Sequence, residues 1–547
     1  PDKWWPPAQP GLGEAFISFP DGSELHFVSS NEGSSWGSDS DINYSLKMIR
    51  DAATLATTWL LTGPDGTIET FDSAGRLVRI DLLGGRWQNL IYSDLETALA
   101  IAPKPGLLIE VHDNFMRKIQ FRYDAQGHMT TLTDPGGQEY FYSYALVGTQ
   151  KLLASVTFPD GLRRQYLYKE EFYQPNRTGT PLLTGIVDEI SPEIFRRYAT
   201  FKYDNAGVPV RTEHNGGTNL YTFNPSINAV TDPLGAVRNY SFGFTNNLPT
   251  LNAQSQPGPG GAGTVWRYYS YDSNGNITNF RDFNNTATDF SYDGRNLEVS
   301  RTEAVRTPLA RKISTNWHPE RRLKTGIAEP KRITTFTYDD VGNMIERVEQ
   351  ATSDATGFAG FNATPVGSSR RWTNTYNGAG QLLSVTGPRV GQVVSYSYDA
   401  QGNLASMRNP LGHLTTYSDY DANGRVGSIT TPDGVISVFR YTPRGWLANQ
   451  TMTSNGVSES TSYDYDGTGQ LTKVRLPNGT DITYGYDDAR RLTRIGDSAG
   501  NTIRYILNPL GQRTSEEILD DRGILSRRIN RIFDALSRLT QVTGATQ

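Results

Sequence analysis

One seven-residue pattern recurs along this chain at a nearly fixed spacing. It consists of an aromatic residue, an acid, two spacers, a glycine, one further residue and an aliphatic residue, as in Tyr398–Leu404. From Tyr398, the leading aromatics at Tyr420, Tyr441, Tyr465 and Tyr486 follow at intervals of 22, 21, 24 and 21 residues. A fixed period means that one small structural unit is copied and stacked. The pattern therefore predicts a repeat array whose function resides in the whole array rather than in one site.

The same unit occurs earlier in the chain, where insertions separate the copies. In six well-preserved copies, the aromatic, the acid and the glycine are predicted to define the repeat. No catalytic, cofactor-binding or metal-binding residue is predicted, and no cofactor is expected. The repeat-defining residues are Tyr123, Asp124, Gly127, Tyr271, Asp272, Gly275, Tyr338, Asp339, Gly342, Tyr398, Asp399, Gly402, Tyr420, Asp421, Gly424, Tyr465, Asp466 and Gly469.

A second signature, x-Pro-x-Gly, falls about half a period away, as in Asn409–Gly412 and Thr431–Gly434. Both signatures are typical of turns. In Asp-x-x-Gly, the Asp side chain can accept the backbone N–H two residues on, and the glycine supplies a positive φ. In x-Pro-x-Gly, proline presets φ at the second position and glycine suits the fourth.

The runs between these turns, such as Val435–Tyr441, are rich in β-branched and aromatic residues, which indicates strands joined in hairpins. The predicted fold class is all-β: a long antiparallel meander of repeat hairpins. Open sheets rarely exceed about ten strands without curling, and closure removes exposed edges. The meander is therefore expected to coil into a hollow β-shell, with a larger radius in solution than a solid globule has.

Two regions are expected. Residues 1–60 form an N-terminal hairpin and an irregular segment, in which Asp41–Leu55 is predicted to hold a short helix. Residues 61–547 form the repeat shell, with regular repeats from about residue 376. The chain opens on Pro1 rather than Met, which we interpret as a processed or excised piece.

Composition excludes several classes of partner. The net charge is −5 and the pI is near 5.8, which argues against nucleic acid or an anionic membrane as the main partner. No apolar run approaches the length of a membrane span. The absence of cysteine excludes disulfides and thiolate metal sites. A hydrophobic content of 36% favours a thin wall with one solvated face over a filled domain.

Four short motifs match known sites only in part. Gly258–Gly263 fits G-x-G-x-x-G but lacks a βαβ context. Ser35 fits a nucleophile elbow without an evident His or acid partner. Asp39–Asn43 begins like a calcium loop, but the glycine and glutamate that an EF-hand needs are missing, and the repeat already explains Asp464–Gly469. The histidines show no ligand spacing and are expected to be solvated or packed: His26, His112, His128, His214, His318 and His413.

The interleaved Tyr-Asp-x-x-Gly-x-Leu and Asp-Pro-x-Gly signatures resemble the YD repeats of the Rhs family. Relatives of that family include the C component of insecticidal toxin complexes and teneurins. The resemblance extends from about Phe16 onward, and Leu107–Asp113 with Thr133–Gly137 resembles the early part of an Rhs core. It implies a ribbon wound into a cocoon that encloses a C-terminal toxin. Bacterial Rhs proteins are exported by contact-dependent machinery such as type VI secretion, in bacterial competition.

The resemblance implies several partners and a location. The expected partners are a C-terminal toxin cargo of the same parent polypeptide and an N-terminal plug or secretion-machinery component. The protein is expected to be secreted after synthesis in the bacterial cytoplasm. Asn508–Gly511 is followed by Gln512 rather than the leucine of the family's cleavage segment, so no protease residue is carried over. The last strand, around Arg538–Thr543, is expected to be an unpaired edge of an incomplete shell.

The leading hypothesis is a shell fragment without activity of its own. One alternative is a cell-surface adhesin or glycan-binding protein, which exposed clustered tryptophans would favour. The other is an enzyme built on the repeats, which would require a concentrated polar cleft.

Overall fold

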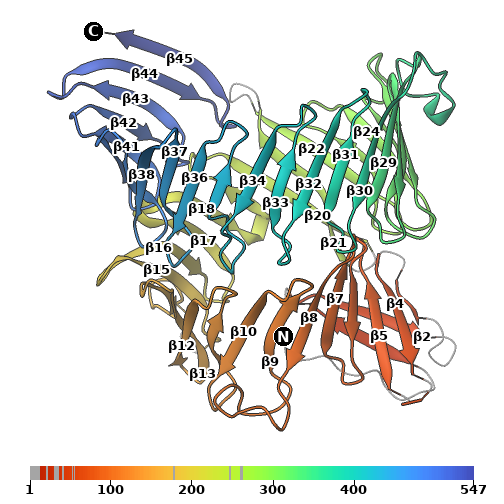
Figure 1. Cartoon of the computed structure of the whole chain (residues 1–547), viewed down its shortest axis with the longest axis horizontal. Coiled ribbons are helices and arrows are strands. Elements are labelled where there is room, and N and C mark those ends of the chain that lie inside the picture. Colours follow the sequence, from red (N-terminus) through yellow and green to blue (C-terminus); the bar gives the residue numbers. More distant parts are fainter. Residues whose placement is uncertain are drawn as a thin grey trace. The chain divides into compact units, whose positions relative to one another are not determined.

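The computed structural model describes residues 13–19, 22–29, 36–39, 42–51, 53–54, 56–175, 179–245, 248–258 and 263–546. The secondary structure of these residues is almost entirely β-strand, and the strands are joined by turns, longer loops and short 3-10 helices (Figure 1). Every strand pairing described is antiparallel and joins strands that follow one another in the sequence. The predicted all-β antiparallel meander is therefore confirmed.

The first elements are β1 (Glu14–Ser18), β2 (Glu24–Ser29), β3 (Trp36–Gly37), β4 (Ser45–Arg50), β5 (Thr57–Thr62), β6 (Ile68–Phe71), β7 (Leu77–Leu82), β8 (Arg86–Tyr92), β9 (Leu108–Asp113), β10 (Lys118–Tyr123), β11 (Met129–Thr133), β12 (Glu139–Val147), β13 (Gln150–Thr157), β14 (Arg163–Tyr168), β15 (Leu183–Ser191), β16 (Ile194–Tyr203), β17 (Pro209–His214), η1 (Asn215–Gly217), β18 (Thr218–Asn224), η2 (Pro225–Ile227), β19 (Ala229–Thr231), β20 (Val237–Thr245), β21 (Leu248–Pro257) and β22 (Thr264–Tyr271). The remaining elements are β23 (Ile277–Arg281), β24 (Ala287–Tyr292), β25 (Glu298–Glu303), β26 (Arg311–Trp317), β27 (Lys324–Glu329), β28 (Arg332–Tyr338), β29 (Met344–Ala351), η4 (Gly360–Asn362), β30 (Arg370–Tyr376), β31 (Leu382–Thr386), β32 (Val393–Tyr398), β33 (Leu404–Arg408), β34 (Leu414–Ser418), β35 (Ser428–Thr430), β36 (Ile436–Tyr441), β37 (Leu447–Ser454), β38 (Val457–Tyr465), β39 (Leu471–Arg475), β40 (Asp481–Tyr486), β41 (Leu492–Asp497), β42 (Thr502–Leu507), β43 (Arg513–Leu519), β44 (Leu525–Phe533) and β45 (Leu539–Thr546).

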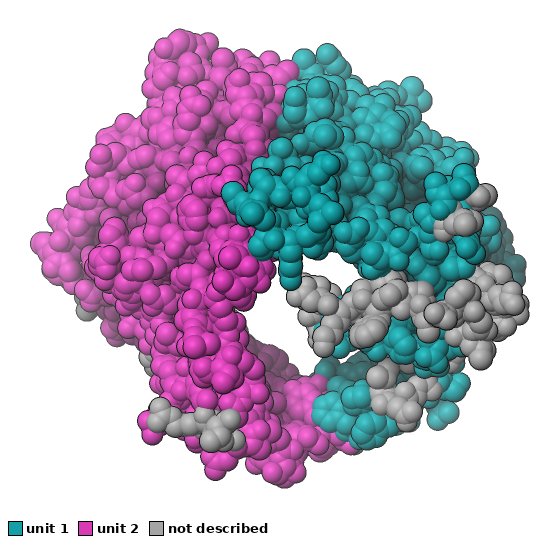
Figure 2. Space-filling model, turned by 90° about the horizontal axis from the view of Figure 1, so that it is seen from below, with its two compact units in different colours: residues 1–120, 242–252, 267–415 teal, residues 121–241, 253–266, 416–547 magenta. Residues whose placement is uncertain are grey.

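The chain divides into two compact units, each built from segments that are distant in the sequence (Figure 2). Unit 1 comprises residues 1–120, 242–252 and 267–415. Unit 2 comprises residues 121–241, 253–266 and 416–547. Within each unit, early repeats thus pack with repeats from much later in the chain.

The best-buried core lies at the N-terminal end of unit 1. The small sheet β1-β2-β3 packs there with β4 to β6. Ile17, Phe27 and Leu61 are almost completely buried. Every second residue of β1 and β5 is buried, as expected of strands with one face on a core.

The short helix predicted within Asp41–Leu55 is wrong. Ser45–Arg50 is strand β4, which pairs in register with β5. Leu46 is buried while Lys47 and Ile49 are exposed, so the run has a strand period of two. Pairing with β5 decides the conformation, because local propensity is a weak guide when a neighbouring strand offers backbone hydrogen bonds.

Elsewhere most strand side chains are half-buried rather than enclosed. β31 and β33, for example, contain no fully buried residue. Side chains on a sheet whose faces are only partly covered stay in this intermediate state. The low hydrophobic content of the sequence follows from this arrangement.

Candidate functional site: the repeat turns, the contacts between distant turns, and an arginine-lined cavity

Each repeat turn is organised by the side chain of its acid. In the turn after β32, Oδ1 of Asp399 accepts the N–H of Gln401 at 2.9 Å and that of Asn403 at 2.8 Å. The N–H of Gly402 donates to the carbonyl of Asp399 at 3.1 Å. Gly402 has a φ of 77°, in the left-handed region that favours glycine. One aspartate and one glycine thus close the turn.

The other well-preserved copies have the same geometry. In each, Oδ1 of the aspartate accepts the N–H two residues on, at 2.8 to 3.1 Å. Their glycines have φ values from 78° to 93°. The aspartates are Asp124, Asp272, Asp339, Asp421 and Asp466.

Copies of the proline-containing signature that begin with Asp or Asn build this turn as well. Oδ1 of Asn409 accepts the N–H groups of Leu411 and His413, each at 3.0 Å. Gly412 has a φ of 85°. An uncharged amide therefore performs the same task as the aspartate carboxylate, because both present an acceptor oxygen at the same position.

The repeat tyrosine joins neighbouring repeats through its hydroxyl group. The hydroxyl of Tyr398 donates to the carbonyl of Leu382 at 2.9 Å, and that of Tyr441 donates to the carbonyl of Val426 at 2.9 Å. In each pair the acceptor is the aliphatic residue that ends the preceding copy of the motif. Burial raises the pKa of these phenols, so they remain neutral donors. Sequence reasoning missed this bond, whose only signal is that a tyrosine recurs 15 to 20 residues after an aliphatic residue.

The turn hydrogen bonds also control ionisation. Burial disfavours the charged form of Asp339, but the amide of Asn343 and several backbone N–H groups outweigh it and lower the pKa of this carboxyl. The pKa of Asp272 is lowered in the same way, and Asn276 is the partner that stabilises its charged form most strongly. Ionised carboxylates therefore hold the turns at neutral pH.

Turns that are far apart in the sequence meet within unit 2. Nδ2 of Asn423 donates to Oδ2 of Asp134 at 3.0 Å, across 289 residues of sequence. The N–H of Gly136 donates back to Oδ1 of Asn423 at 3.1 Å. The N–H of Gly467 donates to the carbonyl of Ile190 at 2.7 Å. These bonds pin the later repeats to the earlier ones, and we name them the turn seam of unit 2.

An ion cluster reinforces this seam. Asp188, 4% exposed, accepts Nε of Arg164 at 2.7 Å and also pairs with Arg490. The guanidinium of Arg490 stacks on Tyr198 at 3.9 Å. Burial, and then the nearby Arg164, lowers the pKa of Arg490 to about 10. Two guanidinium groups, those of Arg164 and Arg490, therefore share the single carboxylate of Asp188.

Unit 1 contains equivalent contacts between distant turns. The N–H of Gly84 donates to the carbonyl of Val341 at 2.9 Å. A Cβ added to Gly402 would lie 2.5 Å from Cε1 of Phe115. The repeat glycine therefore serves both a positive φ and a close approach from a distant turn.

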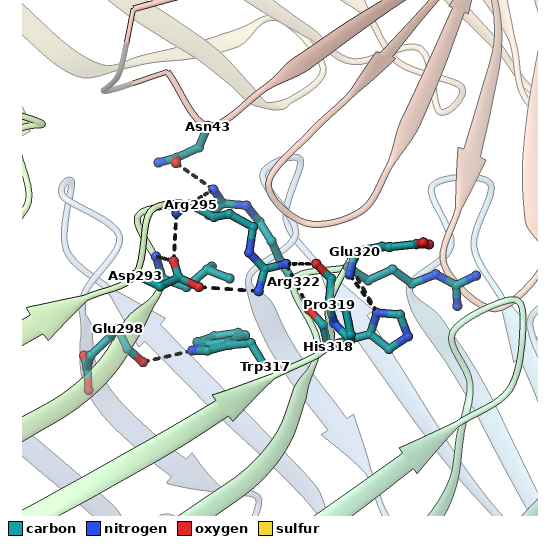
Figure 3. Close-up of polar contacts among 11 residues, drawn as sticks. Asn43, Asp293, Arg295, Glu298, Trp317, His318, Pro319, Glu320 and Arg322 are labelled. Atoms are coloured by element: carbon teal, nitrogen blue, oxygen red, sulfur yellow. Dashed lines mark hydrogen bonds and ion pairs between the residues drawn. The ribbon is translucent and has the colours of Figure 1, made fainter.

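An arginine-lined cavity of about 740 Å³ lies between such turns in unit 1 (Figure 3). Arg322 donates to Oδ1 of Asn43 at 2.6 Å and to the carbonyl of Arg295 at 2.5 Å. Arg295 donates to the carbonyls of His318 and Pro319. Burial, and then Arg295, lowers the pKa of Arg322. The arginines use these donors to join the loops that surround the cavity.

The structure describes the partial motifs only in part. Ser35, Asp41 and residues 259–262 of the glycine-rich motif lie outside the described residues. Asp466 is occupied by the N–H groups of Thr468 and Gln470. No group of three or more His, Asp or Glu with metal-binding geometry occurs in the described ranges.

The histidines are engaged locally. Nδ1 of His318, for example, accepts the N–H groups of Glu320 and Arg321. The other five contact a neighbouring carboxylate, amide or aromatic ring: His26, His112, His128, His214 and His413.

Comparisons with known proteins agree with this repeat architecture. Residues 361–518 match the family model described as Teneurin YD-shell, and residues 106–139 match the one described as RHS Repeat. These two segments of the chain are therefore similar to the YD and RHS repeats of those families. The YD repeats are thus recognised in both the regular and the interrupted part of the chain.

The proteins to which this chain is similar include a toxin and components of toxin complexes. Double-stranded DNA deaminase toxin A of Burkholderia cenocepacia (strain H111) is 27% identical over 370 residues, covering 56% of this chain and 22% of the relative. A TcdB2-TccC3 crystal structure superimposes with a TM-score of 0.43 at 13% identity, covering 98% of this chain and 35% of that chain. A structure of the Photorhabdus luminescens Tc holotoxin pore superimposes with a TM-score of 0.35 at 13% identity, covering 97% of this chain and 35% of that chain. The chain spans about a fifth of the curated relative and about a third of the solved chains.

No helix among the described residues has the length and hydrophobicity of a membrane-spanning segment.

Proposed function

We propose that this chain is wall material of a bacterial Rhs-type toxin shell, which encloses a C-terminal toxin of the same parent polypeptide. The observation that carries the proposal is the match to a YD-shell model on a meander whose turns bond to turns and strands 287 to 302 residues away. Such bonds join strands and turns from an early part of the meander to those from a much later part. A ribbon fastened in this way can form a closed, hollow wall, which a flat meander cannot.

The toxin relative supports a toxin as cargo. The proposal includes an N-terminal plug or secretion-machinery component as a further partner, and export from the bacterial cytoplasm by machinery such as type VI secretion. Under this proposal, the wall acts by steric enclosure and has no catalytic activity of its own. The hydrogen-bond donors and acceptors of the turns bond to one another within the fold, which supports a structural role.

The adhesin alternative receives no support from the tryptophans that the structure describes. Each tryptophan that the structure describes is buried or half-buried, so none offers the exposed ring that glycan binding needs.

The decisive experiment is limited proteolysis of the parent polypeptide, after its gene has been sequenced past Gln547. A segment that follows Gln547 should be cleaved much more slowly in the parent than as an isolated domain. The Arg490→Met variant of the parent, which weakens the turn seam, should lose part of this protection. Equal cleavage rates for the enclosed and the isolated segment would contradict the shell.

Solution scattering of the chain provides a second test. A solid globule of this length would have a radius of gyration of about 24 Å. A hollow wall should give a larger value with a minimum in the scattering profile. A radius at the value of a solid globule would contradict a hollow wall, whatever the cargo.

A further inference from the structure

The arginine-lined cavity of unit 1 has the size of a ligand-binding site. Its volume of about 740 Å³ lies within the range of about 300–1,000 Å³ that is typical of ligand pockets. Its lining comes from within residues 38–85 and 294–341, which belong to unit 1. Gly66, Gly85 and Gly294 lie on this lining and have no side chain to fill the space.

Part of the lining is aliphatic. The residues that provide it are Ile42, Ile68, Leu82, Leu83 and Val341. Leu83 is held between two turns, because its side chain lies 3.0 Å from where a Cβ on Gly66 would be and 2.9 Å from where one on Gly342 would be. An apolar group that entered the cavity would be removed from water against these side chains, which favours binding.

Arg322 adds free hydrogen-bond donors to this lining. Its Nη2 donates to Oδ1 of Asn43 and to the carbonyl of Arg295, whereas Nε and Nη1 have no acceptor among the described residues (Figure 3). Neither of these two nitrogens is shut off from solvent. A molecule in the cavity can therefore accept a hydrogen bond from Arg322.

The arginines of the cavity bond mainly to backbone carbonyl groups. Nη1 of Arg321 donates to the carbonyl of Asp339 at 3.2 Å, and its Nη2 donates to the carbonyl of Asp340. Arg295 donates to two further backbone carbonyls. The acceptor that fits the free donors of Arg322 in the same way is the carbonyl oxygen of another peptide group.

The charges around the cavity are nearly balanced. Three arginines and four acids line it: Arg295, Arg321, Arg322, Asp39, Asp81, Glu320 and Asp340. Arg295 pairs with Asp293 and Asp81 with Arg79, while Asp39, Glu320 and Asp340 are exposed to water. A ligand without net charge therefore disturbs this balance least.

We propose that this cavity binds a polypeptide segment through an uncharged aliphatic side chain. The side chain would pack against Ile68 and Leu83, and a backbone carbonyl next to it would accept a hydrogen bond from Arg322. This inference goes beyond the toxin shell, because it assigns a ligand to one cavity and does not depend on what the wall encloses.

The test uses the whole chain with ¹³C-labelled isoleucine methyl groups, in which NMR reports the environment of Ile68. The signal is assigned with Ile68→Val. The probes are four peptides that differ at one residue: acetyl-Gly-Leu-Gly-amide and its versions with Gly, Glu or Lys in place of Leu, all at constant ionic strength. The leucine peptide should shift the Ile68 signal saturably. It should bind at least fivefold more tightly than the other three, because only leucine gains from burial against the aliphatic lining.

Two glycine variants separate the cavity from general effects. Gly294→Leu should abolish binding by filling the cavity, because a Cβ at Gly294 would meet no atom within 4 Å and the residue has no positive φ. Gly378→Leu is the matched control: Gly378 has the same open surroundings and also follows the acceptor residue of its turn, but it does not line the cavity. It should bind the leucine peptide as the wild type does. Both variants should keep the urea midpoint of the wild type.

The hydrogen bond is tested by Arg322→Lys, which keeps the charge but loses the planar fork and should weaken binding of the leucine peptide at least threefold. Four outcomes would overturn the proposal: no saturable shift with the leucine peptide, equal binding of the glycine peptide, tightest binding of the glutamate or lysine peptide, or undiminished binding by a folded Gly294→Leu. The comparison of the four peptides on the wild type decides the matter even if a variant fails to fold.

Discussion

A single acceptor oxygen organises each turn that begins with Asp or Asn, and the residues that provide it follow from the geometry. Asp399, Asn409 and Asn377 all accept the backbone N–H groups two and four residues on. The next requirement is a backbone with positive φ three residues after the acceptor, which glycine meets without strain. These two requirements explain why the acceptor residue and the glycine recur from copy to copy while the two residues between them vary.

Three glycine substitutions should rank by this logic. Gly378→Ala should leave stability unchanged or slightly raised, because Gly378 has no positive φ and open space around an added Cβ. Gly412→Ala should cost about 1 kcal/mol, because its φ of 85° is strained for alanine although the space is open. Gly402→Ala should cost about 2–3 kcal/mol, because the new methyl group would also overlap Phe115. Urea denaturation of the three variants gives the order.

Gly424, predicted from the sequence to cost about 1 kcal/mol or more if its φ is positive, has a φ of 79° and belongs with Gly412. An equal effect of Gly378→Ala and Gly412→Ala would show that φ does not govern these turns.

The tyrosine hydroxyl can be tested on one strand. Tyr398→Phe removes the bond to the carbonyl of Leu382 and should lower the free energy of unfolding by about 1 kcal/mol. Tyr396→Phe, two residues earlier in β32, is the control and should change it by only a few tenths. Equal losses in both variants would assign the cost to packing of the rings instead of the hydrogen bond.

The hairpins could be predicted from the sequence, whereas the seam could not. Strands and turns such as β36 with Thr431–Gly434 depend on residues close in the sequence, so composition and turn chemistry reveal them. The contact of Asn423 with Asp134 depends on which of many similar turns come together. Nothing in one turn marks its distant partner, and the acceptor of the Tyr398 hydroxyl is a backbone carbonyl common to all residues.

Removing a seam cation should destabilise unit 2 strongly. Arg490→Met removes the pair with buried Asp188 and the contact with Tyr198, and should cost about 2–4 kcal/mol. Arg522→Ala is the control, because Arg522 is 74% exposed and pairs only with surface carboxylates, and should cost less than about 0.5 kcal/mol. Hydrogen exchange at Gly467 should accelerate in the first variant alone. An unchanged rate there would mean that the ion cluster does not hold the seam.

Across the whole chain, the turn carboxylates make stability depend on pH in one direction. Hydrogen bonds lower their folded pKa values below the value of about 3.9 in the unfolded chain. The unfolded state therefore takes up protons first, and the stabilisation is present above that value and lost as the pH falls through the lower folded values. Turn carboxylates with lowered pKa values are Asp124, Asp272, Asp339, Asp497, Asp520 and Asp534.

Urea midpoints should consequently be equal at pH 7 and pH 6 and should fall steadily below about pH 4. Asp339→Asn, which copies the neutral turn at Asn377, should fold and show a slightly weaker acid dependence. A midpoint that stays constant down to pH 3 would show that the carboxylates are not needed in their ionised form.

The bond between Asn423 and Asp134 also has a consequence in time. During synthesis, 289 residues must be added after Asp134 before its partner exists. At about 5–20 residues per second, that wait lasts about 15–60 s on the ribosome. Hairpins form within microseconds, so the early repeats fold long before the seam can close. During that interval, the early turns of unit 2 expose hydrogen-bonding groups whose partners have not yet been synthesised. We expect a chaperone that covers these turns to assist folding at this stage.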